Sequence, residues 1–176
     1  VGEIFDGLML PSFQSVYFIG ICGTAMASVA AALQERGISV TGSDQNVYAP
    51  MSTFLKNRGV EVRDGYHENN LPKASDLVVI GNAISRGNPE VEMVLERKLH
   101  YCSLPELLKE TFSQGKRSLV VAGTHGKTTT SSLLAWVFEH NGLNPSYLIG
   151  GIPNNFNQGA RFTDSEWFII EGDEYD

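Results

Sequence analysis

Short apolar runs alternate with amphipathic stretches along most of this chain, and that alternation restricts the folds it can adopt. Val16–Ile19 predicts a strand, and Ala25–Arg36 predicts a helix that ends at Gly37, a residue suited to the left-handed turn after a helix. Parallel strands need such crossover helices, so the pattern is typical of an α/β fold with a parallel sheet. Further strands of this sheet are expected at Ser39–Gly42, Val60–Arg63, Leu77–Ile80 and Leu99–Cys102.

Two later segments carry the signals of a helix start. Asn88-Pro89-Glu90 combines an N-cap residue, a proline at the first helical position and an acid that faces the helix dipole. Ser103 and Glu106 have the spacing of a capping box, which predicts a helix through about Phe112. Both signals place helices next to the predicted strands, as a parallel sheet requires.

The pattern resets at a polar, glycine-containing linker near residue 115. New strands are expected at Ser118–Ala122, Tyr147–Ile149 and Trp167–Ile170, with a helix at Lys127–Asn141. We therefore predict an N-terminal extension (1–15), a Rossmann-like domain with a parallel sheet (16–114) and an incomplete α/β domain (115–176). A small parallel sheet leaves apolar surface uncovered, so Trp167 and Phe168 are expected to be exposed unless another copy or a missing segment covers them.

Charge and composition exclude several classes of function. Asp and Glu number 20 against 13 Lys and Arg, and a net charge of −7 argues against a nucleic-acid partner. The apolar runs are far shorter than the roughly 20 residues that span a bilayer, and the first residues lack the basic region of a secretory signal. Cys22 and Cys102 form neither a disulfide framework nor a zinc-binding spacing. We expect a soluble, cytoplasmic protein that acts on small molecules.

A strand, a glycine turn and a lysine followed by threonines succeed one another over Ser118–Thr130. This arrangement directs backbone N–H groups and the positive end of a helix at a phosphate group. Lys127 would bring a positive charge to the β- and γ-phosphates, and Thr128 is placed to ligate Mg²⁺. Val121 stands where the full P-loop pattern has its first glycine, so the match is to a shorter Gly-Thr-x-Gly-Lys-Thr form. The predicted nucleoside triphosphate site consists of Gly123, Thr124, His125, Gly126, Lys127, Thr128 and Thr129.

The last predicted strand adds a candidate metal ligand. Glu171 directly follows this strand, and in P-loop enzymes a carboxylate in that position holds or orients Mg²⁺. The alternative is an acidic strand end that only contacts solvent. We assign Lys127, Glu171 and His125 to the catalytic set, with the role of His125 open, and Thr128 and Glu171 to the metal site.

The first glycine loop, Gly20–Met26, lies where doubly wound folds bind pyrophosphate. Asp44, at the end of the second strand, could meet a ribose hydroxyl. The dinucleotide fingerprint needs a glycine where Cys22 stands and a glycine or alanine at Ala25, so the loop matches it only in part and indicates NAD weakly. A tight turn without a ligand is a further alternative. Cys22 has no base nearby in the sequence, and we interpret it as a small residue that allows a phosphate to approach.

These segments together resemble the Mur ligases, the amide ligases of peptidoglycan precursors. Gly123–Thr130 is similar to their ATP loop, and Gly20–Met26 to their uridine-diphosphate loop. The Gly-Ile-Cys-Gly-Thr form is similar to that of the member which joins UDP-N-acetylmuramate to a recycled L-alanyl-γ-D-glutamyl-meso-diaminopimelate tripeptide. The alanine-adding member usually has glycines where this chain has Cys22 and Ala25. Further segments that resemble the family are Asn46–Ser52, Gly81–Pro89, Ile149–Phe156 and Glu171–Asp176.

The resemblance implies a function for each domain. In Mur ligases a UDP-sugar domain precedes a central ATPase domain and a C-terminal Rossmann-like domain, so 16–114 would bind the UDP-sugar and 115–176 would begin the ATPase domain. The muramate carboxylate would be phosphorylated by ATP with Mg²⁺, and the tripeptide amine would then displace the phosphate in peptidoglycan recycling. The implied UDP-sugar contacts are Gly20, Ile21, Cys22, Gly23, Thr24, Ala25, Met26, Asp44, Asn82 and Ser85.

Two alternatives remain open. One is a UDP-N-acetylmuramate–L-alanine ligase, which has the same chemistry and a different acceptor. The other is a nucleotide-binding module without catalysis. On either ligase interpretation the chain of 176 residues is expected to be inactive alone, because the implied acceptor site lies in a domain that it lacks.

Overall fold

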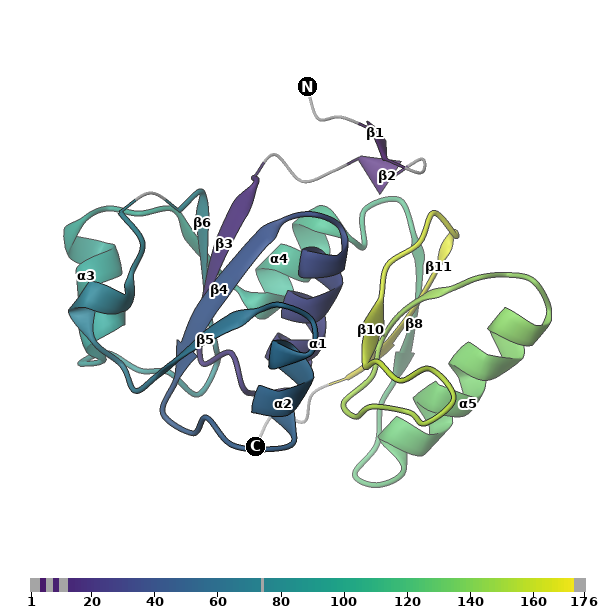
Figure 1. Ribbon diagram of the computed structural model, residues 1–176. Helices are drawn as coiled ribbons and strands as arrows, with labels where there is room; N and C mark the ends of the chain where they lie inside the picture. The colour runs from purple at the N-terminus through teal and green to yellow at the C-terminus, as the bar shows by residue number, and fades with distance from the viewer. Residues whose placement is uncertain (1–3, 6–7, 10–12, 74, 173–176) are drawn as a thin grey trace.

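The computed structural model describes residues 4–5, 8–9, 13–73 and 75–172. They form two principal sheets, and helix α1 (Thr24–Glu35) lies between them (Figure 1). The expected α/β class is confirmed. Within the segment expected to be an N-terminal extension, β1 (Ile4–Phe5) and β2 (Leu8–Met9) pair antiparallel.

The first sheet is parallel throughout and has the order β5-β4-β3-β6-β7. Its strands are β3 (Ser15–Ile19), β4 (Ser39–Asp44), β5 (Glu61–Asp64), β6 (Leu77–Ile80) and β7 (Tyr101–Ser103). The chain moves outward from β3 to β5 and then returns to β6 on the other side of β3. Ligands of doubly wound sheets bind at the carboxyl ends of the strands beside such a reversal. A ligand-binding site is therefore expected at the carboxyl ends of β3 and β6.

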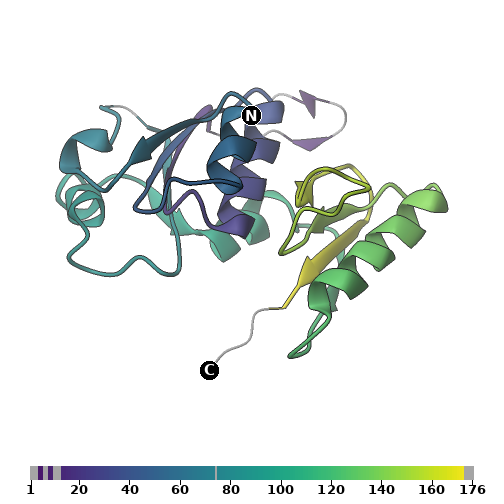
Figure 2. The same cartoon turned by 60° about the horizontal axis from the view of Figure 1, so that its bottom comes forward.

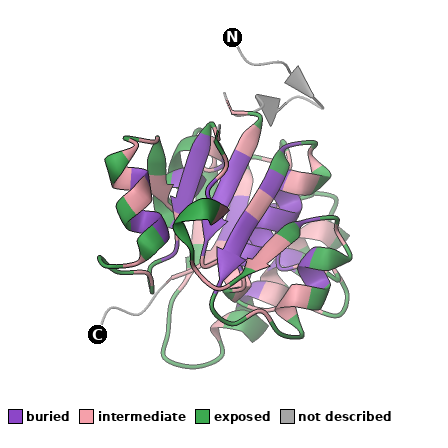
Figure 3. Cartoon of the chain, turned by 60° about the vertical axis from the view of Figure 1, so that its left-hand side comes forward, coloured by how far each residue is buried: buried purple, intermediate pink, exposed green. Residues whose placement is uncertain are grey.

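Helices cover both faces of this sheet (Figure 1). One face carries α1, α2 (Met51–Lys56) and α4 (Leu104–Thr111), and the other carries α3 (Pro89–Glu96) and the 3-10 turn η1 (Glu68–Asn70). The central strands are buried between these layers (Figure 3). The predicted capping box of α4 is confirmed, because the Ser103 Oγ accepts the Glu106 N–H and the Glu106 carboxylate accepts the Ser103 N–H at 2.7 Å.

The second sheet has the order β10-β9-β11-β8. Its strands are β8 (Arg117–Val121), β9 (Ser146–Leu148), β10 (Ala160–Arg161) and β11 (Trp167–Glu171), and α5 (Lys127–His140) covers the outer face (Figure 2). β11 is parallel to β8 and β9, whereas β10 is antiparallel to β9. β10 was not expected from the sequence, since a strand of two residues carries no apolar run.

The expected exposure of Phe168 is wrong, and that of Trp167 holds only in part. The Phe168 side chain is 1% exposed, because it packs against Phe162 and belongs to the hydrophobic cluster that also contains the buried face of α1. Trp167 is half-buried, with Phe138 against the edge of its ring system. The first α/β unit thus covers the inner face of the second. Exposed apolar side chains lie instead on β8 and α5: Val120, Leu133, Trp136 and Val137.

A specific set of contacts joins the two units. The Phe112 and Phe162 rings stack with centroids 3.7 Å apart, and the Arg36 guanidinium lies 5.8 Å from each ring. Arg36 also donates a hydrogen bond to the carbonyl of Phe162. Next to this stack, the Lys116 ammonium donates to the Thr163 carbonyl at 2.6 Å. The segment that connects the units is therefore fixed at both of its ends.

In the described part of the chain, no helix is long and apolar enough to cross a membrane.

Candidate functional site

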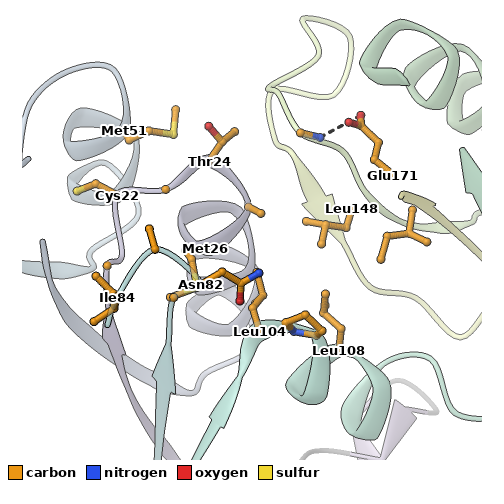
Figure 4. Close-up of a pocket in the computed structure, with 18 of the residues that line it drawn as sticks. Cys22, Thr24, Met26, Met51, Asn82, Ile84, Leu104, Leu108, Leu148 and Glu171 are labelled. Atoms are coloured by element: carbon orange, nitrogen blue, oxygen red, sulfur yellow. Dashed lines mark hydrogen bonds between the residues drawn. The ribbon is translucent and has the colours of Figure 1, made fainter. Parts of the chain in front are cut away.

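A cleft of about 1110 Å³ lies between the two units (Figure 4). One wall consists of the first glycine loop and the start of α1, together with the turn that follows β6. The opposite wall consists of the ends of β9 and β11, with Leu148 and Glu171 (Figure 4). The cleft thus includes both ends of the strand reversal in the first sheet, which the topology singles out as a binding position.

The first glycine loop is held by the end of β4. The Ser43 carbonyl accepts two hydrogen bonds, from the Gly20 N–H at 2.8 Å and the Ile21 N–H at 3.0 Å. The Asp44 carboxylate accepts the Cys22 N–H at 2.8 Å. Gly20 has φ +86°, a value that glycine adopts without strain. The amides of residues 20–22 are therefore engaged within the protein and are not directed at a ligand.

The residues of the first turn of α1 also line the cleft. Thr24, Ala25 and Met26 occupy the first three helical positions, whose N–H groups have no acceptor within a helix. Gly23 provides no side-chain cap, and the first turn contains no acidic residue. By contrast, α3 and α4 both have a side-chain cap and acids in the first turn. The start of α1 is suited to binding a phosphate group.

Asp44 and Cys22 have different surroundings from those that the sequence suggested. The Asp44 carboxylate is 8% exposed, and its second oxygen accepts the Asn46 N–H at 2.9 Å. Its evident task is to hold the loop, and its contact with a ribose stays a prediction. Burial, together with the charge of Asp44, raises the pKa of the Cys22 thiol to about 11. A thiol in that state is a poor nucleophile at neutral pH, which favours its interpretation as a small packing residue.

The turn after β6 contributes unequally to the cleft. Asn82 lines it, and Ile84 packs against Gly20, where an added Cβ would lie 3.3 Å from the Ile84 side chain. Ser85 is exposed and is not among the residues that line the cleft. Its predicted contact with the UDP-sugar therefore has less support than that of Asn82.

The second glycine loop repeats the design of the first. Gly123 has φ +148° and Gly126 has φ +78°, so both adopt backbone conformations that favour glycine. Gly126 is the N-cap of α5, without a side-chain cap and without an acid in the first turn. The Lys127 ammonium donates to the Gly123 carbonyl at 2.7 Å, so the side chain folds back over its own loop. His125 is exposed, with Nδ1 3.2 Å from the Thr124 hydroxyl.

Glu171 connects this loop with β9. One carboxylate oxygen accepts the Ser131 hydroxyl at 2.7 Å and the Gly150 N–H at 3.1 Å. The other accepts the Thr128 hydroxyl at 3.3 Å. The structure thus brings together Thr128 and Glu171, the predicted metal pair, and adds two partners that the sequence analysis missed. Neither partner carries a sequence signal of its own, because Ser131 is one of several hydroxyl residues in α5 and Gly150 one of several loop glycines.

The pair of Thr128 and Glu171 fits a magnesium ion. A carboxylate and a hydroxyl are the hard oxygen ligands that Mg²⁺ prefers, and Mg²⁺ at nucleotides is usually held by few protein ligands plus phosphates and water. Among the residues that the structure describes, no group of three or more His, Cys, Asp and Glu could hold a metal alone. The remainder of the segment that resembles the family here, residues 173–176, lies outside the described residues.

Further residues line the first wall of the cleft that the sequence analysis did not assign to the site. Asn46, Tyr48 and Met51 come from the segment after β4, and Tyr66 from the segment after β5. Burial raises the pKa of Tyr66, and its hydroxyl lies 3.9 Å from where a Cβ on Gly20 would be. The resemblance pointed to Asn46–Ser52 without assigning roles, whereas Tyr66 carried no signal.

The chain is similar to several known proteins. A UDP-N-acetylmuramate–L-alanyl-γ-D-glutamyl-meso-2,6-diaminoheptandioate ligase of Haemophilus influenzae is 52% identical over 163 residues, which are 93% of this chain and 36% of that protein. A UDP-N-acetylmuramate–L-alanine ligase of Rhizorhabdus wittichii is 38% identical over 92% of this chain and 34% of that protein. The crystal structure of the UDP-N-acetylmuramate:L-alanyl-γ-D-glutamyl-meso-diaminopimelate ligase from Neisseria meningitidis superimposes with a TM-score of 0.86 at 43% identity, over 94% of this chain and 54% of that one.

This chain spans about a third of the length of the curated relatives that it matches. The family profile described as "Mur ligase family, catalytic domain" matches residues 15–116, which are more than half of the chain. Of the two glycine loops quoted for the resemblance, the first lines the cleft. The second does not line it and is joined to it through the hydrogen bond from Thr128 to Glu171. On this match, the chain belongs to the Mur ligase family.

Proposed function

We propose that this chain contains the UDP-sugar domain and the beginning of the ATP-binding domain of an amide ligase. The proposed enzyme joins UDP-N-acetylmuramate to the L-alanyl-γ-D-glutamyl-meso-diaminopimelate tripeptide, at the expense of ATP. The observation that carries the proposal is a pair of helix starts, α1 and α5, that both lack side-chain caps and first-turn acids. The start of α1 lines the cleft, and the start of α5 is joined to it through Thr128, which donates a hydrogen bond to Glu171 on the opposite wall. Two such starts suit a reaction between two phosphate-bearing substrates.

The residues of the chain divide the work of the first half-reaction. The first turn of α1 would hold the diphosphate of the UDP-sugar, and the turn at Asn82 would bound the sugar nucleotide. The loop before α5 would hold the triphosphate, with Lys127 neutralising charge on the γ-phosphoryl group as the muramate carboxylate attacks it. An acyl phosphate and ADP result. Phosphorylation is needed because a free carboxylate has no adequate leaving group for amide formation.

Thr128 and Glu171 would hold Mg²⁺ beside the triphosphate. The ion, when bound, supplies positive charge to the phosphate oxygens. Ser131 and the Gly150 N–H keep the Glu171 carboxylate in place, so that its second oxygen stays next to the Thr128 hydroxyl. No side chain has to act as a nucleophile, which agrees with the protonated state of the Cys22 thiol. Alignment and charge neutralisation account for the chemistry.

The second half-reaction determines the acceptor. The tripeptide amine would attack the acyl phosphate carbonyl, and phosphate would leave from a tetrahedral intermediate. The tripeptide is favoured over L-alanine because the relative named for the tripeptide is 52% identical, against 38% for the relative named for L-alanine. The Cys22 and Ala25 positions of the first loop favour the same choice.

A competition assay with the full-length protein tests the proposal. With UDP-N-acetylmuramate and ATP·Mg present, the tripeptide should be ligated far faster than free L-alanine at equal concentration. A preference for L-alanine would transfer the assignment to the alanine-adding ligase. Binding of both nucleotides without release of ADP on addition of either acceptor would leave only the non-catalytic module.

A further inference from the structure

Glu90 is a buried acid that the proposed chemistry does not use. It lies in the first turn of α3 and is 0% exposed. An ionised side chain is rarely buried without partners, because removing a charged group from water costs far more free energy than removing a neutral one.

Four donors from three different segments surround the Glu90 carboxylate. One oxygen accepts the Asn70 side-chain amide at 2.7 Å and the His67 backbone N–H at 3.1 Å. The other accepts the Ser43 hydroxyl and, at 3.4 Å, the Tyr17 hydroxyl. Tyr17 belongs to β3 and Ser43 to β4, whereas His67 and Asn70 follow β5. The carboxylate thus connects α3 to the strands β3 and β4 and to the segment that follows β5.

Two of these contacts lead directly to the cleft. The Ser43 hydroxyl donates to Glu90, and the Ser43 carbonyl accepts the Gly20 and Ile21 N–H groups. Ser43 therefore links Glu90 to the first glycine loop. His67 directly follows Tyr66, whose side chain lines the cleft beside Gly20. Glu90 itself is not among the residues that line the cleft.

We propose that Glu90 is a positioning residue for the UDP-sugar: through Ser43 and the His67 backbone it fixes the first glycine loop and Tyr66 relative to the start of α1. The proposal rests on the proposed function for the identity of the ligand. Glu90 acts from outside the cleft and touches no substrate. Its removal should therefore weaken UDP-sugar binding and leave the ATP loop, which belongs to the other sheet, unaffected.

The experiment compares Glu90→Gln with two other variants of the full-length enzyme. Glutamine keeps the shape but presents an amide N–H₂ to donors that need an acceptor. Ser43→Ala removes only the hydroxyl contact with Glu90, keeps the Ser43 carbonyl that holds the loop, and is the milder change. Val94→Ala is the matched control, because Val94 is buried on the same helix against the same face of the sheet and is not among the residues that line the cleft.

Titration with UDP-N-acetylmuramate and steady-state kinetics provide the readouts. Glu90→Gln should weaken UDP-N-acetylmuramate binding about tenfold, with kcat at saturation and the KM for ATP unchanged. Ser43→Ala should act in the same direction, and the double variant should bind no more weakly than Glu90→Gln alone. Val94→Ala should lower the melting temperature and leave the affinity within about twofold.

Three outcomes would overturn the inference: unchanged affinity in both Glu90→Gln and Ser43→Ala, additive losses in the double variant, or an equal loss in Val94→Ala. If Glu90→Gln does not fold, Ser43→Ala and its control decide alone. A failure of the proposed function is distinct from these results, since the wild-type enzyme would then not bind UDP-N-acetylmuramate.

Discussion

Asp44 and Glu171 are both carboxylates at the end of a strand and next to a glycine loop, but their oxygens have different hydrogen-bond partners. Asp44 uses both oxygens to accept backbone N–H groups of its own surroundings and is nearly buried. Glu171 is less buried and has one oxygen next to the Thr128 hydroxyl. The first carboxylate shapes a loop, and the second is the proposed ligand of a metal ion.

Lys127→Ala in the full-length enzyme should separate the two nucleotide sites. Loss of its charge at the γ-phosphoryl group should reduce kcat by about 10²–10³, the size usual for removal of a transition-state charge partner. UDP-N-acetylmuramate affinity should not change, because the proposed UDP-sugar site lies at α1 and the first glycine loop, in the other α/β unit. Titration and turnover measurements give both quantities. Lys73→Ala, at an exposed lysine away from the cleft, is the control, and an equal loss at both sites would show that the change disturbs the fold.

The raised pKa of Cys22 has a direct consequence for its reactivity. The ordinary value of 9.0 rises to about 11, so the thiolate is rarer at every pH below that value. At pH 8, alkylation by iodoacetamide should be about 100-fold slower than that of free cysteine and should accelerate as pH rises toward 11. Peptide mass spectrometry locates the label. Cys102, whose pKa is also about 11, serves as an internal comparison, and rapid labelling of Cys22 alone would contradict the prediction.

At the scale of elements, the predictable features were the local ones. The capping residues Asn88 and Ser103 were predicted correctly because a helix cap depends on residues that are close together in the sequence. The same is true of both glycine loops, where strand, turn and helix follow one another. β10 could not be predicted, since its pairing with β9 is decided by packing rather than by its own two residues. The Ser131 contact with Glu171 likewise joins elements 40 positions apart.

The contact between α1 and the second sheet depends on Gly159. A Cβ at this position would lie 2.4 Å from the Ser28 hydroxyl and 2.5 Å from the Gly151 carbonyl oxygen. The Ser28 hydroxyl is buried and has no hydrogen-bond partner among the described residues. Helix α1 and the second sheet are therefore in contact at a residue without a side chain, Gly159. At this point α1 contributes the Ser28 hydroxyl, which has no hydrogen-bond partner among the described residues.

Gly159→Ala should lower the free energy of unfolding by about 2 kcal/mol or more, because backbone must move to admit the methyl group. Ser28→Ala should be neutral or stabilising by up to about 1 kcal/mol, since it removes a buried, unpaired hydroxyl. Urea unfolding measures both. The double variant should stay destabilised, as the Gly151 carbonyl still blocks the methyl group. Full recovery in the double variant would show that Ser28 alone sets the spacing.

At the scale of the whole molecule, this chain should bind the UDP-sugar but not complete the ligation. It spans about a third of its curated relatives, and apolar side chains of β8 and α5, such as Val120 at 61% and Leu133 at 60% exposed, lack cover within the described residues. With UDP-N-acetylmuramate, ATP·Mg and tripeptide present, we expect UDP-sugar binding, weak ATP binding and no detectable amide product. Product analysis by mass spectrometry tests this, and turnover at ordinary enzyme rates would refute it.

One hydrophobic cluster contains side chains of both sheets and of the helix between them, among them Val16 of β3, Phe168 of β11 and Ala31 of α1. Melting of either sheet would expose part of the same cluster, so the two units should unfold in a single cooperative transition. A ligand that binds only the folded first unit then stabilises the second as well, by mass action. The UDP-sugar would in this way help to order the loop that receives ATP, without any contact between the two nucleotides.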